Sequence, residues 1–521
     1  MTDGRRDRAV AALRAHLATI ADLRAATAIL RWDQETQMPP GGAEGRALQL
    51  ATLARLAHEL LVSDETRRRL DAASRAADGA EPGSDEAALV RVTRRDLDRA
   101  AKLPADFVAE QRRVTAVATH VWQEARRADD FAVFRPHLEQ VVTLARREAD
   151  YIGYADHPYD ALVDRYDPGM TARELEALFR RLLDVIVPLV RAIAARAGAV
   201  DAGVLDADFD EDAQRAFALE IVQTFGYETR RGRLDLSAHP FSTKFHRDDV
   251  RITTRFGRRL SAVFGTFHES GHAMYSQGTA PALERSPLSE GAGSGIHESQ
   301  SRMWENLVGR SRPFWQYAFP RLRETFPAQL GRTDAEAVYR AVNLVEPGLI
   351  RVRADEATYN LHVILRFELE KALLTEELAV RDLPEAWGGK MRAYLGVVPP
   401  TDTDGVLQDI HWSSGLVGSF PSYTLGNVAS VQLFEAACRA HPAVPAEMRE
   451  GRFETLYGWM REHVYVHGRK FLPAELLERA TGRALTPEPY LRYLRAKFAE
   501  LYGLESAHGG DDKPSGPGAP E

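Results

Sequence analysis

The sequence predicts a mainly α-helical protein with a small amount of β-structure, on three observations. Apolar residues recur at three- and four-residue spacing through most of the 521-residue chain, which is the pattern of amphipathic helices. Only two short segments carry the β-branched residues and partial alternation that are typical of strands. A Gly-, Pro- and Asp-rich stretch at 78–85 is followed at once by renewed helical patterning, so we expect residues 1–505 to form one domain.

The first helix is predicted over residues 5–31, where apolar side chains recur between Arg and Asp. The same spacing predicts further helices over residues 45–75, 85–150, 171–197, 258–277, 296–310, 335–345, 353–380, 426–440, 452–465 and 488–503. Strands are predicted over Arg233–Leu236 and Arg251–Phe256, the second of them just before the helix at 258–277. Ser506–Glu521 has no apolar residue beyond Ala and buries too little surface to fold, so we expect it to be disordered.

Composition and charge exclude several classes of protein. The formal net charge is -8, and nucleic acid binding needs clustered Lys and Arg, so no nucleic-acid partner is expected. The single cysteine, Cys438, cannot form an internal disulfide or a Cys-rich zinc site, and is expected to be a small buried residue. No signal-peptide core follows Met1–Arg6, and no segment approaches the ~18 apolar residues of a membrane helix. We therefore expect a cytoplasmic protein with no membrane partner.

The most informative motif is His268-Glu269-Ser270-Gly271-His272, within the predicted helix 258–277. Side chains four residues apart share one helix face, so the two imidazoles can bind one metal ion. Glu269 is placed to act as a general base on a metal-bound water, whose pKa zinc lowers towards ~7. Gly271 lies on the apolar stripe of this helix, which indicates that another element packs close to it. A chance match is the alternative, and a third ligand would decide against it.

Three downstream glutamates could supply that third ligand, because catalytic zinc usually has three protein ligands and a water. Glu290 lies in a Gly-rich, flexible run that would position a ligand poorly. Glu298 and Glu305 are seven residues apart on one face of the predicted helix 296–310, with Arg302 between them. The position of Glu298 near the helix start favours it weakly, and Glu305 could instead pair with Arg302 or support a ligand.

The chain resembles the carboxypeptidase Taq family of metallocarboxypeptidases from Leu30 to about Leu504. The motifs of that family occur here in order and at family spacing. They are Trp32-Asp33-Gln34-Glu35-Thr36, Met38-Pro39-Pro40-Gly41-Gly42-Ala43-Glu44, His239-Pro240-Phe241, Asp249-Val250-Arg251-Ile252-Thr253, His268–His272, His297-Glu298-Ser299-Gln300, Ile350-Arg351-Val352-Arg353-Ala354-Asp355 and Gly405-Val406-Leu407-Gln408-Asp409-Ile410-His411-Trp412.

The resemblance implies that His268, His272 and Glu298 bind the metal and that Glu269 is the general base. It also implies a mostly helical fold with a deep groove between two halves and usually a homodimer. The predicted strand just before the metal-binding helix indicates a small sheet beside it. This architecture is similar to angiotensin-converting enzyme and neurolysin. Those enzymes usually have an Asp four residues after the glutamate ligand, where this chain has Arg302.

A carboxypeptidase also needs a cation for the terminal carboxylate of its substrate, and a bidentate arginine suits that role. Arg351 is the first candidate because it lies in a family motif, and Arg251 is the second; Arg353 stands where an acid is expected. The alternative for each arginine is an ion pair with a nearby carboxylate, such as Asp355 or Asp249.

Peptide hydrolysis develops an oxyanion, which a His or Tyr donor commonly stabilises beside the metal. His411 and Tyr423 are the candidates, and the related helical peptidases support both. His239 is a candidate for the substrate backbone or a structural residue, and the strand at 251–256 could pair with substrate. Lys244-Phe245-His246 is larger and more charged than expected beside the groove. The tryptophans Trp32, Trp304 and Trp412 are expected to be core residues.

The sequence therefore predicts a metallocarboxypeptidase that removes C-terminal amino acids from peptides. Zinc is the expected ion, although two His and one Glu also accept Co²⁺ or Mn²⁺. An endo-acting oligopeptidase on the same scaffold is the nearest alternative, and a catalytically inactive metal-binding scaffold is another.

Overall fold

The computed structural model describes residues 3–504, and the predicted disorder of Ser506–Glu521 lies outside that range. The N-terminal helices are α1 (Asp3–Thr36), α2 (Ala43–Val62), α3 (Asp64–Ala76), α4 (Asp85–Lys102), α5 (Ala105–Ala128), α6 (Phe131–Ile152), α7 (Pro158–Val163), α8 (Ala172–Ala194) and α9 (Glu211–Phe225). The central helices are α10 (Ser261–Gly278), α11 (Ser294–Arg302), α12 (Arg312–Thr325), α13 (Pro327–Leu330), α14 (Ala335–Ala341), α15 (Tyr359–Leu374) and α16 (Leu383–Leu395). The C-terminal helices are α17 (Pro421–Ala440), α18 (Val444–Arg449), α19 (Glu454–His463), α20 (Pro473–Thr481) and α21 (Glu488–Tyr502).

The prediction of a mainly helical protein is confirmed, and each predicted helical segment contains helix. Two long predicted segments are divided in the structure. Ser63 separates α2 from α3 and caps α3 by accepting a hydrogen bond from the backbone N–H of Thr66. The segment 85–150 forms three helices, because Pro104 interrupts it once and Asp129 adopts a left-handed backbone (φ 54°) before Asp130 caps the next helix.

Several helices were not predicted, and their sequences explain part of the omission. Helix α12 carries Pro320 in its interior, and α16 contains the pair Gly388-Gly389, which weakens a helical pattern. The helices without a counterpart in the prediction are α7, α9, α12, α13, α16, α18 and α20.

A three-stranded sheet lies beside α10 and has the strand order β1-β3-β2. Strands β1 (Leu234–Leu236) and β3 (Asp249–Thr254) confirm the two predicted strands, and they pair in parallel. Strand β2 (Phe241–His246) was missed; it pairs antiparallel to β3 and forms one edge of the sheet. The suggestion that the strand at 251–256 pairs with substrate is wrong, because β3 is the middle strand and both its edges are occupied.

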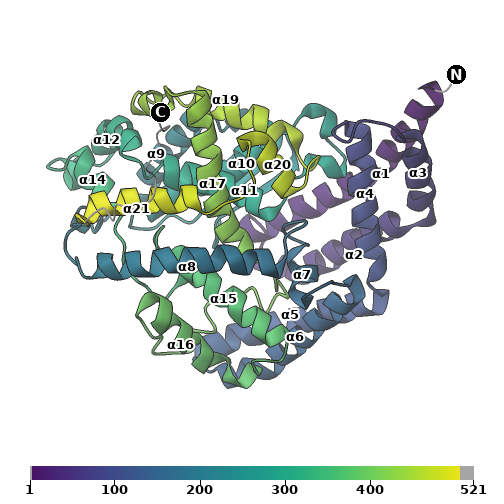
Figure 1. Ribbon diagram of the computed structural model, residues 1–521, viewed down its shortest axis with the longest axis horizontal. Helices are drawn as coiled ribbons and strands as arrows, with labels where there is room; N and C mark the ends of the chain where they lie inside the picture. Colours follow the sequence, from purple (N-terminus) through teal and green to yellow (C-terminus); the bar gives the residue numbers. More distant parts are fainter. Residues whose placement is uncertain (1–2, 505–521) are drawn as a thin grey trace, which may run out of the picture.

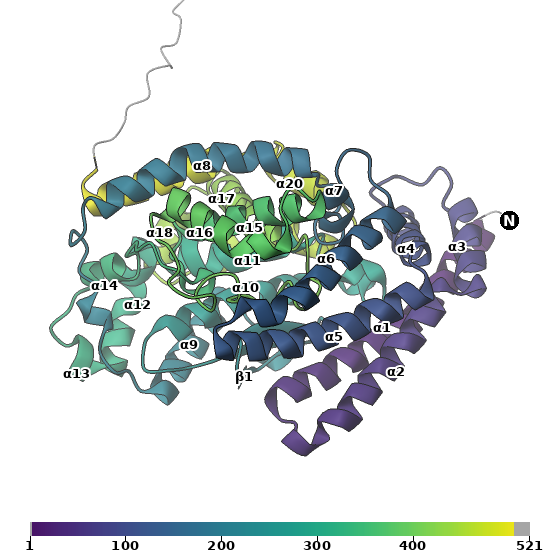
Figure 2. The same ribbon diagram turned by 90° about the horizontal axis from the view of Figure 1, so that it is seen from below.

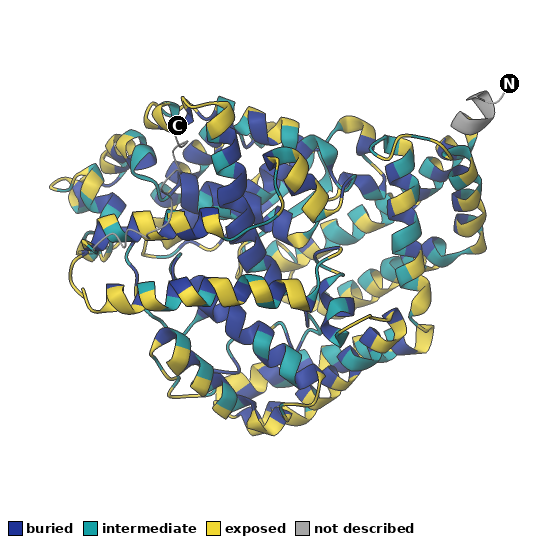
Figure 3. Cartoon of the chain, viewed as in Figure 1, coloured by how far each residue is buried: buried dark blue, intermediate teal, exposed yellow. Residues whose placement is uncertain are grey.

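The buried core lies where α10, α11 and α17 meet, in the centre of Figures 1 and 3. Helix α11 packs against both α10 and α17. The long helices α1 and α2 form a hairpin at one end of the molecule, away from this core, with α3 and α4 beside them (Figure 2). These four helices share a smaller apolar core with Leu283 and Leu288 from the segment between α10 and α11.

Cavities lie between the N-terminal helices and the edge strand β2. One of about 690 Å³ is lined by α1, α2 and Phe241–Thr243. Another of about 420 Å³ is lined by α1, by Lys244–His246 and by the segment 284–290 that leads into α11. A single deep groove between two halves, and the single domain over residues 1–505, stay predictions.

Other predictions concern burial and membranes. Trp304 and Trp412 are core residues as expected, whereas Trp32, although buried, lines the cavity of about 690 Å³. Cys438 is only half-buried, and burial raises the pKa of its thiol to about 11. Among residues 3–504, no helix has both the length and the apolar character needed to cross a bilayer.

Candidate metal centre and active site

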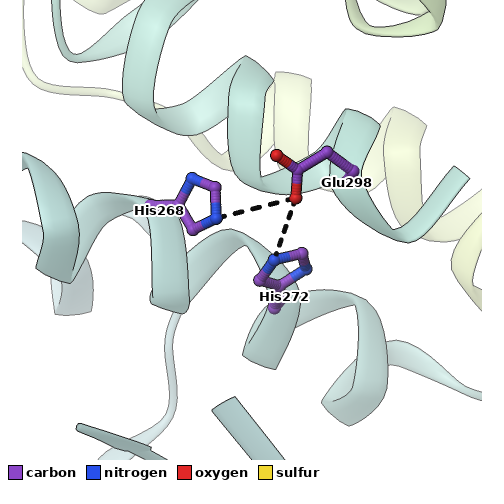
Figure 4. A group of neighbouring side chains, drawn as sticks. All are labelled: His268, His272 and Glu298. Atoms are coloured by element: carbon purple, nitrogen blue, oxygen red, sulfur yellow. Dashed lines mark ion pairs between the residues drawn. The ribbon is translucent and has the colours of Figure 1, made fainter. Parts of the chain in front are cut away.

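Helix α10 places His268 and His272 on one face, and Glu298 reaches them from the adjacent helix α11 (Figure 4). Glu298 Oε2 lies 3.6 Å from His268 Nε2 and 3.4 Å from His272 Nε2, and one ligand atom from each residue lies within 4.8 Å of the others. Three atoms bound to one tetrahedral zinc at ~2.1 Å are about 3.4 Å apart. The three predicted ligands therefore fit a divalent ion such as zinc.

Two glycines allow the helices to approach closely enough for this arrangement. A Cβ on Gly271 would lie 2.5 Å from the carbonyl oxygen of Gln300, so α11 passes directly over this point of α10. A Cβ on Gly426 of α17 would lie 2.5 Å from Cγ of Glu298. The prediction that an element packs against Gly271 is confirmed, and Gly426 adds a second close contact to α11, made from α17.

The ring nitrogens of the two histidines that face away from Glu298 also have partners. His268 Nδ1 lies 2.9 Å from Glu305 Oε2, which is the carboxylate–histidine contact that orients metal ligands in many proteins. His272 Nδ1 lies 2.6 Å from His297 Nδ1. Burial and the nearby His272 lower the pKa of His297 to about 3, so His297 is neutral at neutral pH. Glu305 thus makes both contacts considered for it, one to the candidate ligand His268 and one to Arg302.

Arg302 links the two glutamates. Its Nε donates to Glu298 Oε1 at 2.7 Å, and its Nη1 donates to Glu305 Oε2 at 3.2 Å. Burial alone would raise the pKa of Glu298, but Arg302 and the two histidines hold it well below its usual range. Because Arg302 occupies Oε1, the other oxygen of Glu298 faces the histidines.

Glu269 is 6% exposed and, among the described residues, its carboxylate has no hydrogen-bond partner. Burial raises the pKa of Glu269, although His268 and His272 act in the opposite direction. A carboxylate with a raised pKa beside a metal site suits a group that takes up a proton and releases it again.

Arg351 belongs to a buried network of charged side chains and is not a free cation. Its Nη2 donates to Asp409 Oδ1 at 2.7 Å, and its Nη1 donates to the Tyr359 hydroxyl at 2.9 Å. Arg366 also binds Asp409, with 2.7 Å between Nε and Oδ2. Arg351 therefore has an ion pair, although not with Asp355, which accepts hydrogen bonds from the backbone N–H groups of Ala357 and Thr358 in the turn before α15.

The two oxyanion candidates contact one another. His411 Nε2 lies 3.0 Å from the Tyr423 hydroxyl, and Phe420 stacks on the His411 ring with 4.4 Å between ring centroids. Burial lowers the pKa of His411 to about 4 and raises the pKa of Tyr423 above its usual range. His411 is therefore neutral and Tyr423 protonated at neutral pH. The Arg351 guanidinium lies 5.0 Å from the Tyr423 ring, so these three residues form one group.

The remaining substrate-binding candidates lie outside this group. Arg251 makes a bidentate pair with Asp249, at 2.9 Å for each contact, and its guanidinium stacks on Trp32. This is the ion pair that the sequence offered as the alternative for Arg251. His239 is exposed, and among the described residues its side chain has no hydrogen bond or ion pair.

Sequence reasoning missed several residues of the site because their partners are distant in the chain. Asp409 lies in the Gly405–Trp412 motif but was not given a role, although an acid beside the candidate His411 was an available signal. Arg366 and Tyr359 carried no such signal, since α15 also holds Asn360, His362, Glu368, Glu370 and Lys371, and spacing does not single out any one of its polar residues.

Comparison with known proteins supports the resemblance along most of the chain. Residues 12–498 match the family model described as carboxypeptidase Taq (M32) metallopeptidase. Thermostable carboxypeptidase 1 of Thermus thermophilus is 42% identical over 487 residues, which cover 91% of this chain and 95% of that protein. Carboxypeptidase 1 of Bacillus subtilis is 37% identical, over 92% of this chain and 96% of its own length.

A solved structure agrees. The M32 carboxypeptidase of Deinococcus radiodurans R1 superposes with a TM-score of 0.92 at 46% identity, and covers 94% of this chain and 99% of its own. The resemblance inferred from the ordered motifs is confirmed. The chain belongs to the carboxypeptidase Taq (M32) family of metallopeptidases and is a metal-dependent carboxypeptidase.

Proposed function

We propose that this enzyme removes amino acids one at a time from the free C-terminus of peptides, with a divalent ion held by His268, His272 and Glu298. The observation that carries the proposal is the spacing of the three ligand atoms, with Glu269 beside them on α10. Zinc is the proposed ion, and Co²⁺ or Mn²⁺ would suit the same donors. When bound, the ion would acidify a coordinated water and polarise the peptide carbonyl.

Glu269 is proposed as the general base. It takes the proton of the attacking water and passes it to the leaving amine, so that the group ends the cycle as it began. Burial, which raises the pKa of Glu269, makes it a stronger base than an exposed glutamate. The absence of a hydrogen-bond partner among the described residues leaves its carboxylate available for this exchange.

Arg351 is proposed to attract the terminal carboxylate of the substrate. Arg351 and Arg366 share the single carboxylate of Asp409, so this buried group keeps a surplus positive charge. Burial alone would lower the pKa of Arg351, but Tyr359 and Asp409 raise it. An anionic substrate end would neutralise the surplus charge, which favours a peptide with a free C-terminus over one whose end is capped. Arg251 and His239 are proposed only as contacts further along the peptide.

Tyr423 and His411 are proposed to stabilise the oxyanion. If His411 Nε2 carries a hydrogen, it donates to the Tyr423 oxygen, and the phenol hydrogen is then free to donate to the substrate. The raised pKa of Tyr423 keeps that hydrogen in place at neutral pH. Each donor aimed at a developing oxyanion can contribute about 10²–10³ in rate.

Three further proposals rest on the family resemblance and on composition. They are a homodimer, a cytoplasmic location and a single domain over residues 1–505.

The proposed base is tested by Glu269→Gln, which keeps the shape of the side chain and removes its basicity. We expect the variant to bind metal as the wild type does and to lose about 10²–10⁴ in kcat. Metal content by mass spectrometry and peptide hydrolysis are measured on the same sample. Hydrolysis at the wild-type rate would show that Glu269 is not the base.

The proposed metal is tested by chelation followed by addition of Zn²⁺, Co²⁺ or Mn²⁺. The products of a peptide with free ends are then followed by mass spectrometry. We expect chelation to abolish activity and the added ion to restore a ladder of products shortened from the C-terminus. Internal fragments would instead indicate an endo-acting oligopeptidase.

A further inference from the structure

A second buried carboxylate, Glu370 on α15, lies behind the loop that carries His411. It is 1% exposed and accepts three hydrogen bonds. The donors are the Tyr159 hydroxyl at 2.8 Å, the Trp412 indole N–H at 2.9 Å and the backbone N–H of Gly418 at 3.1 Å. No Lys or Arg forms an ion pair with Glu370 among residues 3–504. Glu370 therefore differs from Asp409, which binds two arginines.

Two of these donors, Trp412 and Gly418, lie near opposite ends of one short loop, residues 411–420. Trp412 directly follows His411, and Gly418 lies two residues before Phe420, whose ring stacks on His411. Gly418 has a φ of +89°, and a Cβ at this position would lie 2.9 Å from the backbone of Leu162. This close approach to α7 needs glycine and brings the Gly418 N–H to the carboxylate.

The loop has little regular structure to hold it. It consists of turns before α17 begins at Pro421, with internal backbone hydrogen bonds such as Leu416 N–H to His411 O at 2.9 Å. The position of the loop therefore depends on its contacts with other elements. Glu370 accepts two hydrogen bonds from the loop, and the Thr119 hydroxyl of α5 donates one to the Ser413 carbonyl.

We propose that Glu370 is a positioning residue for catalysis: its carboxylate fixes the 411–420 loop so that His411 meets Tyr423. This inference rests on the proposed roles of His411 and Tyr423. Glu370 acts from behind the loop and does not touch the substrate. A buried carboxylate without an ion-pair partner is costly, and burial raises the pKa of Glu370 to about 7. The proposed role of Glu370 is to set the geometry of the loop.

The test is Glu370→Gln, because all three partners are donors and an amide can accept on only one side. The amide nitrogen must face at least one donor, so the loop loses a contact. We expect kcat to fall about tenfold or more, while KM stays within about threefold and metal affinity is unchanged. The matched control is Glu368→Gln on the same helix, whose carboxylate accepts from Lys390 and Tyr394 away from the loop. It should keep kcat within about twofold.

A double-mutant cycle with His411→Ala separates this inference from the proposed function. If Glu370 acts through His411, then Glu370→Gln should have little further effect on kcat in the His411→Ala background. If His411→Ala alone leaves kcat unchanged, the proposed role of His411 fails. If His411→Ala lowers kcat and folded Glu370→Gln does not, the inference about Glu370 is overturned.

Trp412→Phe provides a second route in case Glu370→Gln does not fold. It removes one donor of the carboxylate and keeps an aromatic ring against Trp387. We expect kcat to fall several-fold, again without an additive effect in the His411→Ala background. Wild-type kcat in Trp412→Phe, with His411→Ala impaired, would also overturn the inference.

Discussion

The proposed metal ligands and the proposed substrate-binding group are held in place by different means. His268 and His272 are one turn apart on α10, and Glu298 comes from the helix that crosses it. Arg351 and His411 instead come from a single helical turn and an irregular loop, and Tyr423 comes from the first turn of α17. Buried hydrogen bonds and ion pairs to Asp409 and Glu370 connect these segments.

This difference suggests how each side responds to substitution. On the metal side the helical backbone sets the geometry, so the effect of changing a ligand side chain should be confined to the metal. On the substrate side each position depends on several buried polar contacts, which are costly to break singly. Changes there should alter kinetics and stability together while metal binding persists.

The largest effect is expected from removing a ligand. His272→Ala should lose stoichiometric metal and all metal-dependent activity, because two ligands hold the ion poorly. His411→Ala should keep the metal and lose about 10²–10³ in kcat. Metal content and kcat of both variants are compared. Loss of metal from His411→Ala would show that metal binding depends on the substrate side.

Arg351→Gln is expected to have the next largest effect. Removing one member of a buried charge pair costs about 2–5 kcal/mol, so kcat/KM for free-ended peptides should fall by about 10² or more. The free energy of unfolding should fall as well, while metal content stays at the wild-type level. The variant is assayed by steady-state kinetics and urea unfolding. Unchanged kcat/KM would remove Arg351 from the substrate site.

Glu305→Gln tests the support of His268 on the metal side. Loss of such a partner typically costs 10–100-fold in metal affinity. We expect that loss in a chelator competition, with kcat nearly restored at saturating metal. A lower kcat with unchanged affinity would place Glu305 in the reaction instead.

Gly426→Ala tests the helix contact behind Glu298. A Cβ there would lie 2.6 Å or less from two side-chain atoms of Glu298, so α17 and α11 must separate. We expect about 1–3 kcal/mol of destabilisation together with weaker metal binding. Gly458→Ala in α19 is the control, since a Cβ there meets nothing within 4 Å, and it should be neutral or slightly stabilising. Equal stability of the two variants would contradict the close packing.

The smallest effect concerns the pH dependence of stability. The pKa of Glu370 is raised to about 7, so the folded state holds a proton that the unfolded state releases near pH 4.5. The stabilisation that comes from this bound proton is fully present below pH 4.5 and is lost as the pH rises through 7. Glu370→Gln should therefore lose less stability than the wild type between pH 5 and pH 8. If the unfolding free energies of the wild type and the variant changed equally with pH over that range, the raised pKa would be contradicted.

The sequence located the metal side well because helical spacing alone brings His268 and His272 together. Spacing favoured Glu298 over Glu305 only weakly, and the family resemblance named Glu298 as the third ligand. In the structure a π-helical turn, Met303–Val308, follows α11 and carries Glu305, which contacts the outer nitrogen of His268. Spacing in an ideal helix does not predict such a turn.

The substrate side was predicted less completely. Arg351 and Asp409 are 58 residues apart, and their pairing depends on how two loops fold together. Strand β2 was missed although Phe241 and Phe245 alternate with Ser242, Lys244 and His246. All six of its residues are only partly buried, so the segment lacks the apolar face of a core strand. Contacts of this kind depend on tertiary packing, which local spacing does not encode.

The most direct test of the account compares one peptide with a free C-terminus and the same peptide with an amidated C-terminus. The wild-type enzyme is incubated with each, and the products are followed by mass spectrometry. Since the surplus positive charge at Arg351 is proposed to select a carboxylate, the free peptide should shorten residue by residue and the amidated one should stay intact. Cleavage of both peptides at similar rates would contradict the account.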